Sequence, residues 1–185
     1  MQSAEKNPER NLFYQLLWEV GALQSDAAAL IAENVDWTTN TLSYSRMKTG
    51  QPARLVISKN LAAILNQLPT TGPLFPKILQ IGNKARSAEF CRRCKQLGIE
   101  GVTLHSYRYA WAERAKTCGY PERFAQEALG HNSKAVHRAY ARKAQVVDSD
   151  LGRLRAKDGR HRRVCDHANG SGHSLKESFD RWHQH

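Results

Sequence analysis

Apolar residues near the N-terminus recur at the three- and four-residue spacing of a helix. They are Leu12, Phe13, Leu16, Leu17 and Val20. This pattern predicts a helix with one buried side. The helical spacing restarts after Gly21, where Ser25 is expected to cap a second helix over residues 26–32.

The pattern then changes from helical to extended. Residues 41–46 alternate between apolar and polar side chains, and residues 54–57 are rich in strand-forming types. The sequence "KTGQP" between them is typical of a turn. This segment therefore predicts a small antiparallel hairpin.

Helical spacing returns after the hairpin. Ser58 is expected to cap a helix that the sequence "PTTGPLFP" interrupts, and residues 84–99 form the next amphipathic helix. Together these elements predict a mainly α fold with a small antiparallel β-sheet, which is an α+β architecture.

The last periodic segment predicts three shorter helices. Thr103 is expected to cap a helix over residues 104–118. The next helix ends at Gly130, because glycine readily adopts the left-handed conformation that closes a helix. Ser133 is expected to cap the final helix, which carries Tyr140.

Length and composition allow one core of ordinary domain size. The chain has 185 residues, of which 41% are hydrophobic. The periodic pattern spans residues 11–147 and follows an N-terminal extension over residues 1–10. Residues 148–185 hold five of the eight histidines and many basic residues without a sustained period. We therefore expect a flexible tail there.

Charge narrows the choice of partner. Lys and Arg number 28 against 17 Asp and Glu, which gives a net charge of +11 and favours a polyanion such as nucleic acid. No stretch approaches the roughly 18 apolar residues of a membrane span, and the N-terminus lacks the apolar core of a signal peptide. We therefore expect a cytoplasmic protein with reduced thiols and no membrane partner.

Four polar side chains are concentrated in the last helical segment. His105 and Arg108 are three residues apart and share one face of a helix. His131 follows the glycine that closes the next helix, and Tyr140 comes nine residues later. In a compact fold these four side chains can meet.

Such a set suits phosphodiester chemistry without a metal or a cofactor. A tyrosine hydroxyl can attack phosphorus while guanidinium and imidazole groups neutralise the charge that develops on the phosphate oxygens. Arginine suits this task because its fork donates to two oxygens and stays charged. A general acid must also protonate the departing 5′ oxygen, and a lysine on the hairpin suits that step.

These motifs resemble those of the tyrosine recombinase (phage-type integrase) family. "LHSYR" is similar to its His-x-x-Arg box, "LGH" to its Leu-Gly-His box, and Tyr140 to its nucleophile. The spacings of 23 residues from Arg108 to His131 and of nine from His131 to Tyr140 are typical of that family. "RMKTG" resembles its β-hairpin lysine motif and nominates Lys48.

The resemblance implies a tyrosine recombinase catalytic-domain-like fold over residues 11–147 and a role for each matching residue. Tyr140 would form a 3′-phosphotyrosine, and Arg108 would hold the scissile phosphate. His105 and His131 would assist proton transfer and phosphate contact, and Lys48 would protonate the leaving 5′ oxygen.

The resemblance also implies double-stranded DNA as the partner and a homo-tetramer on DNA. The basic residues that we expect to contact DNA are Arg46, Arg54, Arg142 and Lys143. The first two lie on the predicted hairpin, from which either could also reach the active site.

The sequence departs from the family pattern at two places. Leu23, in "GALQSD", stands where the family has its first catalytic arginine, and the adjacent Gln24 could donate only a neutral hydrogen bond. Losing one transition-state donor typically costs about 10²- to 10³-fold in rate. About ten residues precede the first helix, so we expect the family's N-terminal core-binding domain to be absent and DNA binding to be more salt-sensitive.

Three functions remain open on this sequence. The first is site-specific DNA recombination or integration by strand cleavage and rejoining, impaired by the loss of the first arginine. The second is a non-catalytic DNA-binding protein descended from a tyrosine recombinase, which Leu23 supports. The third is a helix-turn-helix regulator whose recognition helix starts near Ser133. It leaves His105, Arg108 and Lys48 unexplained.

Overall fold

The computed structural model describes residues 5–131 and 133–142. Lys143 and the tail predicted over residues 148–185 lie outside the described residues. The elements are α1 (Pro8–Val20), α2 (Gln24–Ala28), the 3-10 helix η1 (Ala32–Asn34), β1 (Val35–Asp36), β2 (Thr41–Ser45), β3 (Pro52–Val56), α3 (Lys59–Leu65), α4 (Pro76–Leu79), α5 (Asn83–Gln96), α6 (Ser106–Thr117), α7 (Glu122–Leu129) and α8 (Lys134–Tyr140).

The strands form one antiparallel sheet in the order β1-β2-β3. The predicted hairpin is confirmed, with Leu42 opposite Leu55 and Tyr44 opposite Ala53. The sequence did not predict β1, because two residues are too short to establish an alternating pattern. The α+β fold class is confirmed.

Two of the predicted helix caps are confirmed. Ser58 accepts a hydrogen bond from the backbone N–H of Leu61 at the start of α3, and Ser133 accepts one from Val136 at the start of α8. Each side chain satisfies a backbone N–H that has no partner within the first turn of its helix.

The predicted cap at Ser25 is wrong. Ser25 lies inside α2, which begins after Leu23 and ends at Ala28, well before residue 32. The chain leaves the helix because Leu30 and Ala32 hydrogen-bond to the loop at residues 72–74, with N···O distances of 2.9 and 2.8 Å. A tertiary contact therefore overrides the local helical pattern.

The predicted cap at Thr103 is also wrong. α6 begins at Ser106 after His105, which makes no capping hydrogen bond through its side chain. The N–H of Thr103 instead donates to the hydroxyl of Ser106 at 3.0 Å. Because this local bond holds the chain in a turn, the helix starts two residues later than expected.

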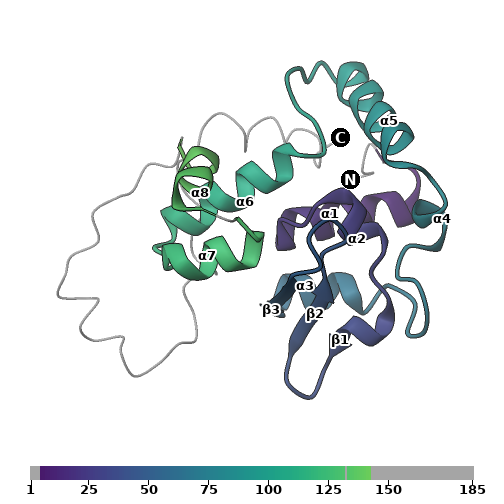
Figure 1. Ribbon diagram of the computed structural model, residues 1–185. Helices are drawn as coiled ribbons and strands as arrows, with labels where there is room; N and C mark the ends of the chain where they lie inside the picture. The colour runs from purple at the N-terminus through teal and green to yellow at the C-terminus, as the bar shows by residue number, and fades with distance from the viewer. Residues whose placement is uncertain (1–4, 132, 143–185) are drawn as a thin grey trace.

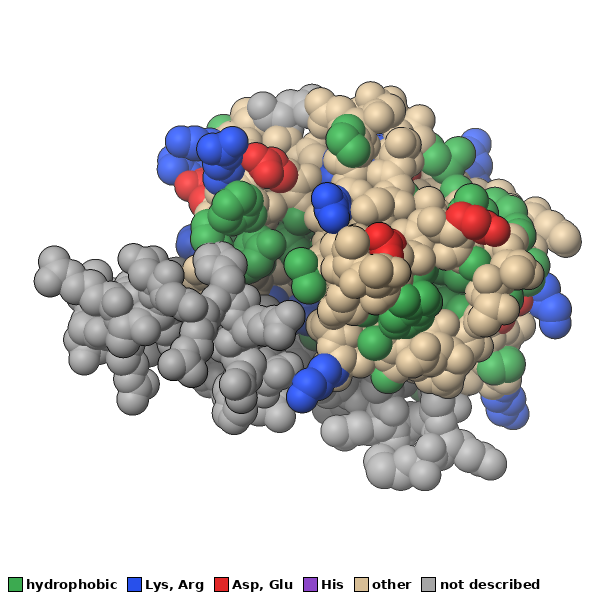
Figure 2. Space-filling model, turned by 90° about the horizontal axis from the view of Figure 1, so that it is seen from below, with side chains coloured by type: hydrophobic (Ala, Val, Ile, Leu, Met, Phe, Trp, Pro, Cys, Tyr) green, Lys and Arg blue, Asp and Glu red, His purple; other side chains and the backbone are tan. Residues whose placement is uncertain are grey.

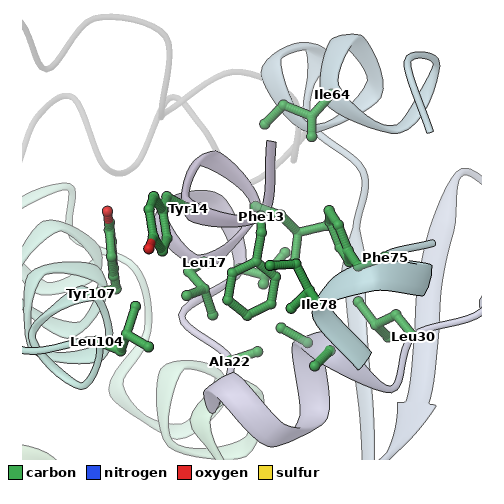
Figure 3. Packing of buried hydrophobic residues seen from close by; sticks show 14 of the residues in the cluster. Phe13, Tyr14, Leu17, Ala22, Leu30, Ile64, Phe75, Ile78, Leu104 and Tyr107 are labelled. Carbon is green, nitrogen blue, oxygen red and sulfur yellow. The ribbon is translucent and has the colours of Figure 1, made fainter. Parts of the chain in front are cut away.

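The core is organised around α1, which packs against α3 and α6. In Figure 3, Tyr14 faces Tyr107 of α6, while Phe13 points towards Phe75 and Ile78 on the opposite side. The rings of Phe13 and Phe75 meet edge to face with centroids 5.3 Å apart. Such pairs stabilise a fold by about 0.5–1.5 kcal/mol beyond the burial of their area.

Helices α6, α7 and α8 form a second group beside this core (Figure 1). Its small apolar centre consists of Ala112, Leu129 and Ala141, with Trp111 and Tyr140 packed against it. Helix α7 of this group contacts strand β3 of the sheet. Within the described residues, no helix has both the length and the apolar character that a membrane crossing requires.

Candidate active site

Arg108 lies on α6 and is buried. Its Nη1 donates to the carbonyl oxygen of Gly21 at 3.0 Å, and its Nη2 donates to the carbonyl oxygen of Leu129. Burial lowers the pKa of this guanidinium, but an arginine remains charged at neutral pH. The two bonds use two of its five N–H donors, which leaves donors for a ligand.

His105 and Tyr140 meet although they are 35 residues apart. The distance from His105 Nε2 to the hydroxyl oxygen of Tyr140 is 2.7 Å. Burial and then the charge of Arg108 lower the pKa of His105, so this imidazole is neutral at pH 7. Burial raises the pKa of Tyr140, which keeps the phenol protonated. A neutral imidazole therefore lies in position to accept the phenolic proton.

The ring of Tyr140 is enclosed by three side chains. Tyr109 stacks on it with centroids 4.3 Å apart and an angle of 15°, and the ring of His131 lies 4.4 Å away. The guanidinium carbon of Arg108 lies 5.9 Å from the Tyr140 centroid. These contacts fix the ring at the end of α8.

His131 is placed by the C-terminal turn of α7. Gly130 closes this helix in the left-handed conformation (φ 65°), and the N–H of His131 donates to the carbonyl of Gln126 at 2.9 Å. Burial, followed by the charge of Arg108, lowers the pKa of His131 to about 4. Its Nδ1 is 3.2 Å from Nδ1 of His137. Its buried Nε2 has no hydrogen-bond partner among the described residues.

Arg46 connects the hairpin to this turn. It is buried, and its Nη2 donates to the carbonyl oxygens of Glu127 at 2.7 Å and Ala128 at 2.8 Å, while its Nη1 donates to that of Pro52 at 2.7 Å. The guanidinium occupies the space beside Gly130 that a side chain would need. Arg46 is therefore not on the surface, where we expected it to contact DNA, but holds the turn that carries His131.

Two of the other expected DNA contacts are exposed. Arg54 lies on β3, and Arg142 lies just after α8. Lys48 is exposed on the turn between β2 and β3. The backbone N–H of Met47 donates to the carboxylate of Asp26 at 3.1 Å, which ties this turn to α2. Among the described residues, Lys48 makes no hydrogen bond or ion pair.

Leu23 lines a cavity of about 190 Å³ beside His105. The other lining residues are Ala22, Gln24, Ser25, Asn83 and Leu104. Nε2 of Gln24 donates to the hydroxyl of Ser87 at 2.8 Å, whereas its Oε1 is buried without a partner among the described residues. A serine hydroxyl both donates and accepts, so the amide can turn over, keep this bond and present its NH₂ group instead. The side chains that line the cavity therefore include neutral donors, the Gln24 amide among them, and no Lys or Arg.

The structure brings together four of the five predicted catalytic residues, namely His105, Arg108, His131 and Tyr140. Lys48, exposed on its turn, makes no hydrogen bond with any of them. The sequence interpretation missed His137, which is buried in α8 against His131. Its spacing of three residues from Tyr140 was the available signal, because it places both side chains on one face of a helix.

This combination of a mainly helical fold, a small sheet and a Tyr-His-Arg-His cluster defines the catalytic-domain fold of the tyrosine recombinases. A sequence profile described as Phage integrase family matches residues 1–146. The chain belongs to the phage integrase family, which confirms the resemblance. A comparison with curated protein sequences finds no match.

Solved structures agree with this fold. An integrase of the transposon Tn1549, in complex with transposon right-end DNA, is 11% identical with a TM-score of 0.61, over 80% of this chain and 57% of that one. XerH site-specific recombinase bound to difH is 18% identical with a TM-score of 0.59, over 84% and 49%. A λ integrase dimer bound to a COC′ core site is 17% identical with a TM-score of 0.62, over 79% and 46%.

These identities establish similarity of fold alone. The chain spans about half the length of the three structures. The expected tyrosine recombinase catalytic-domain fold is confirmed.

Replacing Gly130 by alanine is expected to destabilise the protein more than replacing Gly50. Both glycines have a positive φ, of 65° and 67°, which costs an alanine about 1–2 kcal/mol. A Cβ at Gly130 would lie 2.5 Å from Nε of Arg46, whereas one at Gly50 meets nothing within 4 Å. Urea denaturation of Gly130→Ala and Gly50→Ala measures the difference. Equal losses would show that Arg46 does not restrain this turn.

The buried His137 and the half-buried His105 and His131 predict that stability falls as the pH is lowered. The pKa of His131 drops from 6.5 to about 4 on folding, and the pKa values of His105 and His137 are also lowered. Between about pH 6.5 and pH 4, the unfolded chain therefore binds more protons than the folded chain, and the free energy of unfolding decreases. Urea midpoints measured from pH 7.5 to 4.5 test this.

The variant His131→Asn should show a weaker dependence on pH than the wild type over the same range, because one of the three histidines is removed. An unchanged slope would mean that His131 titrates normally in the folded protein.

Proposed function

We propose that this protein breaks and rejoins double-stranded DNA in site-specific recombination, through a 3′-phosphotyrosine at Tyr140. The proposal is carried by one observation above all: the 2.7 Å contact between Tyr140 and a neutral His105, with the Arg108 guanidinium beside the tyrosine ring. A nucleophile, a proton acceptor and a permanent positive charge then meet at one point.

The cleavage step follows from these groups. The hydroxyl oxygen of Tyr140 bonds to phosphorus while its proton passes to Nε2 of His105. The bond from phosphorus to the 5′ oxygen breaks, and Lys48 gives that oxygen a proton. Arg108 and His131 donate to the non-bridging oxygens, whose negative charge grows in the transition state.

Rejoining is the reverse of cleavage. The 5′ hydroxyl of a partner strand attacks the phosphotyrosine and gives its proton to the neutral Lys48. Tyr140 then leaves and recovers its proton from His105. Exchange of two strand pairs in this way requires a homo-tetramer on DNA, with residues 11–147 as the catalytic unit of each protomer.

Lys48 suits the role of general acid because its turn is anchored while its side chain is exposed. The bond between Met47 and Asp26 holds the turn against α2, whose start lines the cavity beside His105. A lysine on a four-carbon stem can then reach the leaving oxygen once DNA is bound.

Leu23 makes this site weaker than that of a recombinase with two arginines. The amide of Gln24 supplies a neutral donor in the same cavity, and a neutral bond is roughly half as strong as a charge-assisted one. We therefore expect slow cleavage by the natural chain.

DNA contact is supported by the net charge of +11 and by the exposed positions of Arg54 and Arg142. The face in Figure 2 carries separate Lys and Arg side chains with acidic groups near some of them. The basic charge on this face is thus distributed and not gathered into one patch, which favours contacts to the phosphate backbone at several points.

A nicked suicide duplex, selected for binding from a random pool, tests the proposal. The nick lets the short 5′ product diffuse away, so that the covalent protein–DNA complex accumulates. We expect a slow covalent band with the wild type and none with Tyr140→Phe, because that variant lacks the attacking oxygen. Leu23→Arg should form the band about 10²- to 10³-fold faster, since it restores a charged donor.

Tyr109→Phe is the matched control. Tyr109 stacks on Tyr140, and phenylalanine keeps the stack while removing a second hydroxyl, so the band should persist. If the covalent band disappeared in Tyr109→Phe and persisted in Tyr140→Phe, the assignment of Tyr140 as the nucleophile would be contradicted.

A non-catalytic DNA-binding function is the second candidate, and the observation that favours it is Leu23 in the cavity beside His105. It predicts that wild type binds the duplex and forms no covalent band. If Leu23→Arg forms the covalent band and the wild type does not, the natural site lacks one donor and is otherwise intact.

A further inference from the structure

His137 is a buried histidine that the proposed reaction does not use. It lies one helical turn before Tyr140 on α8, and only 4% of its surface is exposed. Its Nδ1 is 3.2 Å from Nδ1 of His131, which is itself in contact with the ring of Tyr140. A buried imidazole requires such a hydrogen bond to offset its loss of water.

The Nδ1–Nδ1 geometry restricts the protons of the pair. A neutral imidazole carries one N–H and one lone pair, and a doubly protonated imidazolium carries two N–H groups. The bond between the two Nδ1 atoms needs one N–H and one lone pair, so His131 and His137 cannot both be cationic. Fixing the proton on one ring therefore fixes the tautomer of the other.

Burial disfavours a cation on either ring, and the charges around His131 add to this effect. Arg108, Arg46 and His105 face His131 and lower its pKa, after burial. Burial also lowers the pKa of His137, where the carboxylate of Glu122 raises it and Lys116 lowers it. Burial comes first for both rings, so both are neutral at pH 7.

If the proton of His131 is on Nε2, that nitrogen needs an acceptor. Its Nε2 is buried and has no hydrogen-bond partner among the described residues, although Arg108 and Tyr140 lie close to the ring. Leaving an N–H without a partner is costly. An anionic oxygen bound between Arg108 and Tyr140 would satisfy it.

We infer that His137 is a positioning residue that donates its Nδ1–H to Nδ1 of His131 and so keeps the proton of His131 on Nε2, as a donor to a phosphate oxygen of the DNA. The identity of this ligand rests on the proposed function. The direction of the bond rests on it too, because the bound phosphate is what gives Nε2–H of His131 an acceptor, but the proton arrangement can be measured in the protein without DNA.

Nitrogen-15 NMR of the free full-length protein at pH 7 tests the arrangement. Long-range couplings between ring nitrogens and carbon-bound protons distinguish the two tautomers, and spectra of His131→Asn and His137→Asn assign the signals. We expect Nδ1–H at His137, which is the less common tautomer in water, and Nε2–H at His131. The reverse assignment would overturn the inference.

Two substitutions then separate positioning from packing. His137→Leu fills the space without a donor, so His131 should become a mixture of tautomers. His137→Asn places an amide N–H near the former Nδ1 and should restore Nε2–H at His131. Val136→Ala, an exposed position on the same helix, should leave the spectrum unchanged. If His131 keeps a single, unchanged tautomer in His137→Leu, the inference is contradicted. If that variant does not fold, the tautomers of His131 and His137 in the wild type still test the inference.

Covalent adduct formation on the nicked duplex gives a second readout. His137→Leu should slow it about 10- to 100-fold, as for outer-shell partners that orient a histidine, while DNA affinity stays unchanged. His137→Asn should recover most of the rate. Equal losses in both variants would show a packing role alone. Failure of the wild type to cleave would count against the proposed function and leave the NMR result as the test of the proton arrangement.

Discussion

The buried guanidinium of Arg108 is the interaction on which the rest of the site depends. Its two bonds to the carbonyl oxygens of Gly21 and Leu129 join α6 to the C-terminal ends of α1 and α7. Removing it would leave both carbonyls buried without this donor, at a cost of about 1–3 kcal/mol each. The same group provides the charge beside Tyr140. The fold and the proposed phosphate site therefore share Arg108. This explains why a charged residue lies buried between α1, α6 and α7.

The site combines this single charge with neutral donors. His105 and His131 both have lowered pKa values because burial and the guanidinium disfavour a second positive charge. Leu23, which lines the cavity beside His105, adds no second charge. A phosphate bound as proposed would be oriented by neutral hydrogen bonds and one charge-assisted contact. Precise placement of each imidazole would then matter more than in a site with two arginines. The bond between His131 and His137 serves that placement.

Most local chemistry was predictable from the sequence, apart from the bond between Thr103 and Ser106 that delays the start of α6, and contacts between distant segments were not. The caps at Ser58 and Ser133 depend only on a side chain and the next turn of backbone, and the motif spacing fixed the candidate site. The end of α2 depends on a loop more than forty residues later, and the burial of Arg46 depends on carbonyls 81 and 82 residues away. No local pattern carries that information. Strand β1 was too short to detect.

The central claim is that Tyr140 is the residue that becomes joined to DNA. The most direct measurement is mass spectrometry of the covalent adduct after nuclease and trypsin digestion. Cleavage after Arg and Lys separates Tyr140, in the peptide of residues 139–142, from Tyr109, in the peptide of residues 109–114. The account predicts a 3′-nucleotide on the peptide of residues 139–142. A nucleotide on the peptide of residues 109–114 would contradict it, as would the absence of any adduct on a duplex that the protein binds.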